Sequence, residues 1–412
     1  MNQKYYLRII LLGLALAAAF ALLVCQPVMA EGEPPPEPPP EAPAPVQPAP
    51  AAAEPDGGGE TAAPEGGGEA PLATAELGIL AGPYAWYYCS AEPIGDPVPG
   101  NGKCEETSLA NVILNFAGYG GSGLVYMENS FLEVGSNIFN AIPKMTGLYT
   151  ETGLATINGN LTISGFTGGF KLSGNTGAVG NYGMLVNGIV FFTGNSGAIT
   201  ISDLQVRDLA NHGIKVQNHN GSVSVTNVDS SMNALHGLDV DNTLSASGAV
   251  TIKDSVFNMN AMPAIVTDGM LIGTNGPLTI QGVTASSNGG DGLHIGAASK
   301  ITIKNSVFSN NRYVGPPADG DGIEVMLGTA ADVTLDNVQV NDNRMAGIAL
   351  TTLGNITLNN VSASRNINVN IALNNAGAMP DKKSVTVNSA VLNNSGGNGM
   401  NINASGKVTL NH

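Results

Sequence analysis

The sequence of 412 residues predicts an all-β fold, a single-stranded right-handed parallel β-helix (solenoid) with an N-terminal cap helix. Three observations support this prediction. Glycine is abundant, with 54 residues, and only 12% of the residues are charged. Short β phrases recur every 23 to 32 residues, and an asparagine recurs between them. Such a composition is typical of turn-rich β proteins, and such a period is typical of solenoids.

The first 30 residues have the pattern of an export signal. Lys4 and Arg8 form a basic head, residues 9–24 are an apolar run of 16, and Val28-Met29-Ala30 supplies small residues for cleavage. This predicts a signal peptide over residues 1–30 and a secreted or cell-surface protein. The run is shorter than the about 20 residues of a spanning helix. An uncleaved N-terminal anchor is the alternative, and it would be the chain's only contact with a membrane.

Residues 31–76 form an acidic linker rich in proline and glycine. They contain 13 prolines, ten acidic residues and no basic residue. Proline stiffens such a chain, like charges extend it, and nothing in it can form a core. We therefore expect a disordered linker that holds the following domain away from a surface. A solubilising tail is the alternative.

Residues 77–122 are expected to form a cap region. Cys89 and Cys104 flank a turn-rich segment there, and an exported chain meets oxidising conditions, so we expect one disulfide between them. The stretch TSLANVILNF then predicts an amphipathic helix that begins after a Thr107 cap and ends at Gly118. Its apolar face would cover the open end of the first coil, and it consists of Leu109, Val112, Ile113 and Phe116.

The β-helix is expected over residues 123–412. Nine apolar-Thr-apolar triplets or close variants run from Ile199-Thr200-Ile201 to Val408-Thr409-Leu410. A phrase of the form Gly-apolar-x-apolar, such as residues 292–295, lies between successive triplets, and a third phrase follows each triplet. Three phrases with period-two alternation predict a three-sided coil with three parallel sheets and aliphatic side chains inside. The expected centres of the third phrase include Val256, Val307 and Val391.

An asparagine precedes the Gly-apolar-x-apolar phrase in many coils. Asparagine tolerates left-handed turn geometry, and its amide can bond the equivalent amide of the next coil. We therefore expect a structural ladder at one corner of the coil, formed by Asn233, Asn260, Asn288, Asn343 and Asn366.

These phrases, the cap helix and the first coil GSGLVYMENSFLEV resemble the pectin-lyase-like superfamily of right-handed β-helix repeat proteins. The resemblance covers about residues 105–412. It implies the fold, and it allows several activities, because that superfamily includes polysaccharide lyases and hydrolases, epimerases and surface adhesins.

The net charge of the chain narrows the class of molecule that it can bind. From residue 77 onward there are 22 acidic and 14 basic side chains, a net charge of minus eight, with no basic run. Such a chain is a poor partner for nucleic acid or an anionic membrane surface. Polysaccharides, cations or a cell-surface protein fit better. At the C-terminal end the sequence stops within a coil, and an uncapped coil could pair with another chain.

Equivalent residues of successive coils should stack into columns. The first column is the residue before each Gly-apolar-x-apolar phrase, and we expect it to hold His212, His236, Pro263, Asp291, Asp321 and Ala346. The second column is the outward residue of that phrase, expected to hold Lys215, Asp239, Val266, His294, Glu324, Ala349, Ala372 and Asn401.

Two candidate sites follow from these columns. The first, beside the longest insertion, contains Asp291, His294, Arg312, Asp319, Asp321 and Glu324; the second contains His212, Lys215, His236, Asp239 and Asp241. Asp291 and Asp321 would lie about 5 Å apart, where two carboxylates share a proton or bind a cation. The resemblance implies calcium (Ca²⁺) there, with Arg312 as a base. The hydrolase motifs of the superfamily, a paired Asp and a Gly-His-Gly, are missing.

The sequence thus favours an exported, surface-displayed β-helix for adhesion or glycan contact, without catalysis. The alternative is a polysaccharide-modifying enzyme, a lyase or a glycoside hydrolase, as the resemblance allows. A purely structural spacer is the third possibility.

Overall fold

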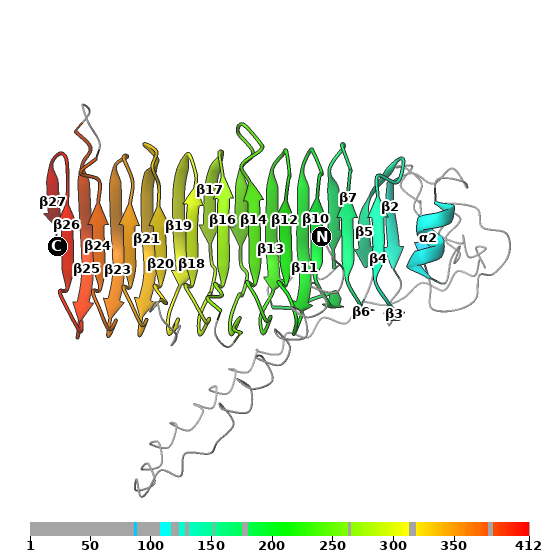
Figure 1. Cartoon of the computed structure of the whole chain (residues 1–412), viewed down its shortest axis with the longest axis horizontal. Coiled ribbons are helices and arrows are strands. Elements are labelled where there is room, and N and C mark those ends of the chain that lie inside the picture. The colour runs from blue at the N-terminus through cyan, green and yellow to red at the C-terminus, as the bar shows by residue number, and fades with distance from the viewer. Residues whose placement is uncertain are drawn as a thin grey trace, which may run out of the picture. The chain divides into compact units, whose positions relative to one another are not determined.

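Two parallel β-sheets make up nearly all of the regular structure in the computed structural model (Figure 1). The structure describes residues 86–88, 108–116, 123–127, 132–150, 153–174, 180–262, 265–312, 319–377 and 382–411. All of them belong to one compact unit, Thr74–His412. The predicted signal peptide and linker, and both Cys89 and Cys104, lie outside the described residues.

The larger sheet has 16 strands within the described part of the chain. They are β1 (Trp86–Tyr88), β2 (Gly123–Met127), β3 (Leu132–Val134), β5 (Met145–Thr150), β6 (Ala155–Asn158), β8 (Phe170–Ser173), β9 (Met184–Asn187), β11 (Ile199–Arg207), β13 (Val223–Asp229), β15 (Val250–Lys253), β17 (Pro277–Gln281), β19 (Lys300–Val307), β21 (Asp332–Asn341), β23 (Ile356–Ser364), β25 (Val385–Asn393) and β27 (Val408–Asn411).

The smaller sheet has 11 strands in the same residues. They are β4 (Asn137–Asn140), β7 (Leu161–Ser164), β10 (Val190–Thr193), β12 (Ile214–Gln217), β14 (Leu238–Asn242), β16 (Met270–Thr274), β18 (Leu293–Ala297), β20 (Ile323–Met326), β22 (Ile348–Thr351), β24 (Ile371–Asn374) and β26 (Met400–Asn403). From β10 to β27 the chain alternates between the two sheets almost throughout, so each coil adds strands to both, and the coils follow one another in chain order (Figure 1).

The triplets stack in register, as predicted. Ile303 pairs with Leu335, and Leu335 pairs with Leu358, in consecutive parallel strands. All three side chains are fully buried and belong to one continuous hydrophobic core. The right-handed parallel β-helix predicted from the sequence is therefore confirmed.

The prediction of three separate sheets is wrong. In β11 the first half pairs with β8 and the second half with β9, so one bent strand carries both the triplet and the third phrase. The bend lies at Asp203, whose φ is 54°. Asn227, Asn305, Asn337 and Asn360 have the same left-handed conformation at the equivalent positions. A single residue of this kind turns the strand, and asparagine and aspartate tolerate it well.

These bends also shift the alternation of the third phrase. Val256 and Val307 are not the inward residues that the sequence analysis expects, because the residue directly after the bend points inward instead. Ser255 and Ser306 occupy the buried positions, and each hydroxyl donates to a backbone carbonyl, at 2.6 and 2.7 Å. Val391 is 55% exposed for the same reason, since the bend falls at Ser389.

The cap helix is present as α2 (Leu109–Asn115), which adjoins β4 at the beginning of the coils (Figure 1). Leu109, Val112 and Phe116 are fully buried, which confirms its apolar face. Its N-cap is Ser108 rather than Thr107, because the Ser108 hydroxyl accepts the backbone N–H of Asn111 at 3.1 Å. Glu133 accepts the backbone N–H of Leu109 at 3.0 Å.

A buried asparagine ladder runs along one corner of the coils, as predicted. Each side-chain amide donates to the amide oxygen of the next coil, at 2.9, 3.1, 3.0, 3.1 and 3.0 Å, and the rungs are Asn233, Asn260, Asn288, Asn311, Asn343 and Asn366. Asn311 is a rung that the sequence analysis did not include. The left-handed residue is the one before each asparagine, for example Met232 and Ser287, and not the asparagine itself.

No helix within the residues described here is both long and apolar enough to cross a membrane.

Removing one rung should destabilise the coil stack. In Asn288→Ala the backbone N–H and the amide of Asn260 lose their common acceptor, which they bond at 3.0 and 3.1 Å. Buried donors left without a partner cost on the order of 1–3 kcal/mol each, so we expect a loss of roughly 2–4 kcal/mol in urea unfolding. Asn211→Ala, at an exposed position, is the control and should change stability by less than about 0.5 kcal/mol. Equal stability of the two variants would contradict a structural role for the ladder.

Candidate functional site

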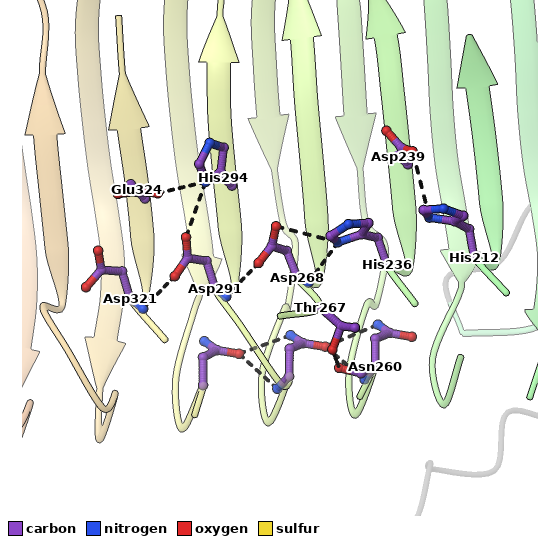
Figure 2. A network of polar contacts seen from close by, with 12 residues as sticks. His212, His236, Asp239, Asn260, Thr267, Asp268, Asp291, His294, Asp321 and Glu324 are labelled. Carbon is purple, nitrogen blue, oxygen red and sulfur yellow. Dashed lines mark hydrogen bonds and ion pairs between the residues drawn. The ribbon is translucent and has the colours of Figure 1, made fainter. Parts of the chain in front are cut away.

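A row of histidine and aspartate side chains follows the N-terminal ends of five strands of the smaller sheet, β12, β14, β16, β18 and β20 (Figure 2). The row is the first column of the sequence analysis. Backbone hydrogen bonds between parallel strands keep this row in register. The glycine N–H of one coil donates to the carbonyl of the column residue in the next coil; Gly292, for example, donates to the carbonyl of Asp321 at 3.0 Å. In chain order the column holds His212, His236, Asp268, Asp291 and Asp321.

Two column members differ from the prediction. Asp268 stands where Pro263 was expected, since the glycine that follows His236, Gly237, donates to the Asp268 carbonyl. In the second column Leu271, not Val266, pairs with both Asp239 and His294.

The reason is an insertion after Asn260. The glycine follows nine residues later in this coil, at Gly269, instead of the four residues that separate Asn288 from Gly292. A signal was present in the sequence, because residues 268–272 repeat the Asp-Gly-apolar-x-apolar pattern of residues 291–295 and 321–325.

Asp268 joins the two predicted clusters into one row (Figure 2). Its backbone N–H donates to Nδ1 of His236 at 2.8 Å, and its carboxylate lies 3.5 Å from the same nitrogen. On the other side its Oδ1 accepts the backbone N–H of Asp291 at 2.8 Å. The side chains from His236 to Asp321 are therefore a single connected site.

The three aspartates of the row form a second ladder. The Asp291 carboxylate accepts the backbone N–H of Asp321 at 2.7 Å, and the Asp321 carboxylate accepts the backbone N–H of Ala346. Asp268, Asp291 and Asp321 are all buried, with Asp291 only 1% exposed. One oxygen of each carboxylate is thus committed to the neighbouring coil.

Burial strongly affects the ionisation of these carboxyl groups. Loss of hydration raises the pKa of Asp268 and of Asp321 to about 7, and it raises the pKa of Asp291 well above its ordinary value. Neighbouring carboxylates raise all three pKa values further. The row therefore holds acids that are partly protonated near neutral pH.

His294 lies between two carboxylates. Its Nδ1 is 2.7 Å from Oε2 of Glu324 and 3.5 Å from Oδ2 of Asp291. His294 and Glu324 are register partners in β18 and β20 and point outward. Hydrogen bonds to Asp291 and Glu324 raise the pKa of His294 to about 10, and the bond to His294 lowers the pKa of Glu324.

The other end of the row carries a second charged group. Lys215 pairs with Asp239 at 2.7 Å, and Nδ1 of His212 lies 3.8 Å from the same carboxylate oxygen. The rings of His212 and His236 stack with centroids 5.2 Å apart. Burial lowers the pKa of both histidines, that of His236 to about 4. Asp241 does not contact this group. Its Oδ1 accepts hydrogen bonds from the backbone N–H and the hydroxyl of Thr243 instead.

Two residues of the first predicted cluster make other contacts. Arg312 donates to the backbone carbonyl of Asp342 at 3.5 Å. Asp319 accepts the backbone N–H of Gly320 at 2.8 Å. The insertion residues 313–318 lie outside the described residues. Of the predicted cluster, the structure thus gathers Asp291, Asp321, His294 and Glu324. Asp319 lies near them, because its carboxylate adds to the effect of burial in raising the pKa of Asp291 and Asp321.

A shallow groove extends from Glu324 across the outer face of the smaller sheet. Its volume is about 500 Å³, and it crosses β20, β22, β24 and β26. Its outward side chains are mostly small or polar: Glu324, Met326, Ala349, Thr351, Ala372, Asn374, Asn401 and Asn403. This groove and the charged row are neighbouring parts of one surface that share Glu324. The sequence columns included several of these residues but gave no sign of a groove.

A family of known proteins matches this architecture. Its description is a right-handed β-helix region, and it matches residues 187–359 and 268–412, which together are more than half of the chain. The chain therefore belongs to the right-handed β-helix family. The resemblance to pectin-lyase-like β-helix proteins is thus confirmed for the fold.

Solved structures give distant likenesses. The chain is similar to the pectate lyase Pel9A, with 13% identity and a TM-score of 0.45, over 77% of this chain and 78% of that chain. It is also similar to the catalytic domain of a GH87 α-1,3-glucanase in complex with tetrasaccharides, with 13% identity, a TM-score of 0.35 and 78% and 70% of the chains covered. No curated protein sequence matches.

His236 should make the protein sensitive to acid. Its pKa is about 4 in the folded chain, where burial is the main cause, against an ordinary value of 6.5. The unfolded chain then binds a proton that the folded chain does not, so stability is lost as the pH falls from about 6.5 to about 4. The difference corresponds to roughly 3 kcal/mol. In His236→Asn the amide oxygen can still accept the N–H of Asp268, and urea unfolding from pH 7.5 to 4 should show a smaller loss.

The test compares the free energy of unfolding as a function of pH in the wild type and in His236→Asn. Asp241→Asn, which removes an exposed charge on the same face, should follow the wild-type profile. Parallel profiles for wild type and His236→Asn would show that His236 does not titrate in this way.

Proposed function

We propose that this protein is an exported, surface-displayed β-helix that binds a neutral polysaccharide along the groove of its smaller sheet, without catalysis. The observation that carries this proposal is the groove of about 500 Å³ across four parallel strands. Export and display rest on the basic and apolar N-terminal segment and on the acidic linker of the sequence.

The groove offers the chemistry that a sugar chain requires. The amides of Asn374, Asn401 and Asn403 can donate to and accept from hydroxyl groups. The small side chains of Ala349 and Ala372 form the floor of the groove and leave room above it for a ligand. Because parallel strands repeat about every 4.8 Å, an extended polymer would meet the same kinds of group at each strand. The negative charge of the chain from residue 77 onward favours a neutral glycan over an acidic one.

The buried aspartates favour binding over catalysis. A general acid has to reach the oxygen that it protonates. Asp268 and Asp291 are 4% and 1% exposed, and one oxygen of each is bonded to the next coil. Beside these aspartates, His294 and Glu324, with side chains 27% and 22% exposed, are groups that a polysaccharide can reach directly. An enzyme that modifies polysaccharides remains the alternative.

Filling the groove should weaken glycan binding. Ala372 points outward from β24, so Ala372→Tyr would occupy the floor without changing the core. We expect affinity for a soluble neutral polysaccharide, identified first with a panel of xylans, mannans and glucans, to fall at least about tenfold in calorimetry, or 1.4 kcal/mol. Thr357→Tyr, outward on the larger sheet of the same coil, is the matched control and should bind normally.

Two results would contradict the proposal. Absence of binding to every polysaccharide in the panel would remove the proposed ligand class, and equal affinity of the two tyrosine variants would remove the groove as its site. New reducing ends or unsaturated products during the same incubations would instead support the enzymatic alternative.

A further inference from the structure

We propose that Asp291, His294 and Glu324 bind a divalent transition-metal ion, for which Zn²⁺ is the best match. One ligand atom from each residue lies within 4.8 Å of the other two. The donor set is one imidazole nitrogen and two carboxylate oxygens. This site goes beyond glycan binding, because its ligand is an ion that the groove residues other than Glu324 do not touch.

The three ligand atoms lie close enough together for tetrahedral coordination after a small adjustment. Zinc bonds of about 2.0–2.2 Å place neighbouring ligand atoms roughly 3.4 Å apart. Nδ1 of His294 and Oδ2 of Asp291 are already 3.5 Å apart. Nδ1 of His294 and Oε2 of Glu324 are 2.7 Å apart and would have to separate slightly. Glu324 is a long, half-buried side chain, so rotation about its own bonds is enough.

Hydrogen bonds and strand register hold the three ligand residues in place. Oδ1 of Asp291 accepts the N–H of Asp321 at 2.7 Å, which leaves Oδ2 directed at His294. The backbone N–H of Asp291 donates to Asp268 at 2.8 Å. His294 and Glu324 are held side by side by the register of β18 and β20. Such outer contacts orient ligands and are a regular part of metal sites.

Asp291 lies among other acidic groups, which favours a cation because a bound ion would stabilise their ionised forms. Asp291 has a carboxylate on each side in the column, Asp268 and Asp321, in addition to Glu324. Arg312, the base expected nearby, donates to the Asp342 carbonyl instead. A protonated His294 paired with the carboxylates is the alternative occupant of the same space, since a proton and a metal ion compete for Nδ1.

The nitrogen ligand distinguishes the metal. Calcium takes six to eight oxygen ligands, whereas zinc accepts imidazole and carboxylate together and in open sites keeps one position for water or another ligand. The structure therefore favours Zn²⁺ over the Ca²⁺ expected from the family resemblance. Because Glu324 also lines the groove, the metal site would lie at the end of the groove.

Calorimetry of the full chain with Zn²⁺ alone tests the site. We expect one equivalent to bind to the wild type, and affinity to fall at least about 100-fold in His294→Ala and in Glu324→Gln, since loss of an outer contact alone costs 10–100-fold. His212→Ala, at the other end of the row, is the matched control and should bind as the wild type does. Substitution by Co²⁺ should give the visible absorption of a tetrahedral site, which His294→Ala should lack.

Circular dichroism of each variant shows whether it is folded, and a variant that fails this check is replaced by His294→Gln or Glu324→Ala. The proposal is overturned if the wild type binds no Zn²⁺, if folded variants of His294 and Glu324 bind it as tightly as the wild type, or if Ca²⁺ binds more tightly than Zn²⁺. Because no glycan is present, failure here leaves the groove proposal untouched.

Discussion

The parallel hydrogen bonds between successive coils are the constraint on which the rest of the structure depends. They place each residue over its equivalent in the next coil, about 4.8 Å away. Aliphatic residues then form continuous inner files, as Ile303, Leu335 and Leu358 do. A polar residue that recurs at the same position of successive coils likewise contacts its equivalent in the next coil. Both the stability of the fold and the chemistry of its surface follow from this vertical repetition.

Two polar ladders show opposite results of the same constraint. Asparagine carries a donor and an acceptor, so a buried file such as Asn260, Asn288 and Asn311 satisfies itself. Aspartate offers only acceptors when ionised. The carboxylates of Asp268, Asp291 and Asp321 accept backbone N–H groups instead, and burial, with a smaller contribution from neighbouring carboxylates, raises the pKa values of these carboxyl groups. One ladder therefore stabilises the corner of the coil, whereas the other holds buried acids that are partly protonated near neutral pH.

This row of acids lies next to a surface suited to contact. The row ends at His294 and Glu324, where the groove of the smaller sheet begins. Glycan binding and metal binding would use adjoining parts of one face, which is possible because outward residues of a β-helix are free of the core. Flat parallel sheets give such a face regular spacing, and the coil-to-coil register keeps its side chains in place without a ligand.

The sequence by itself determined the fold, because period-two alternation and repeat length are local properties that survive in each coil. It also located the cap helix, through Leu109, Val112 and Phe116, and most rungs of the asparagine ladder. Only the tertiary structure decided which residues share a column. The insertion after Asn260 brings Asp268 instead of Pro263 into the row, and left-handed bends such as Asp254 exchange Val256 for Ser255. The physical reason is that loop lengths vary from coil to coil, while alignment is set by backbone hydrogen bonds between residues that are distant in the sequence.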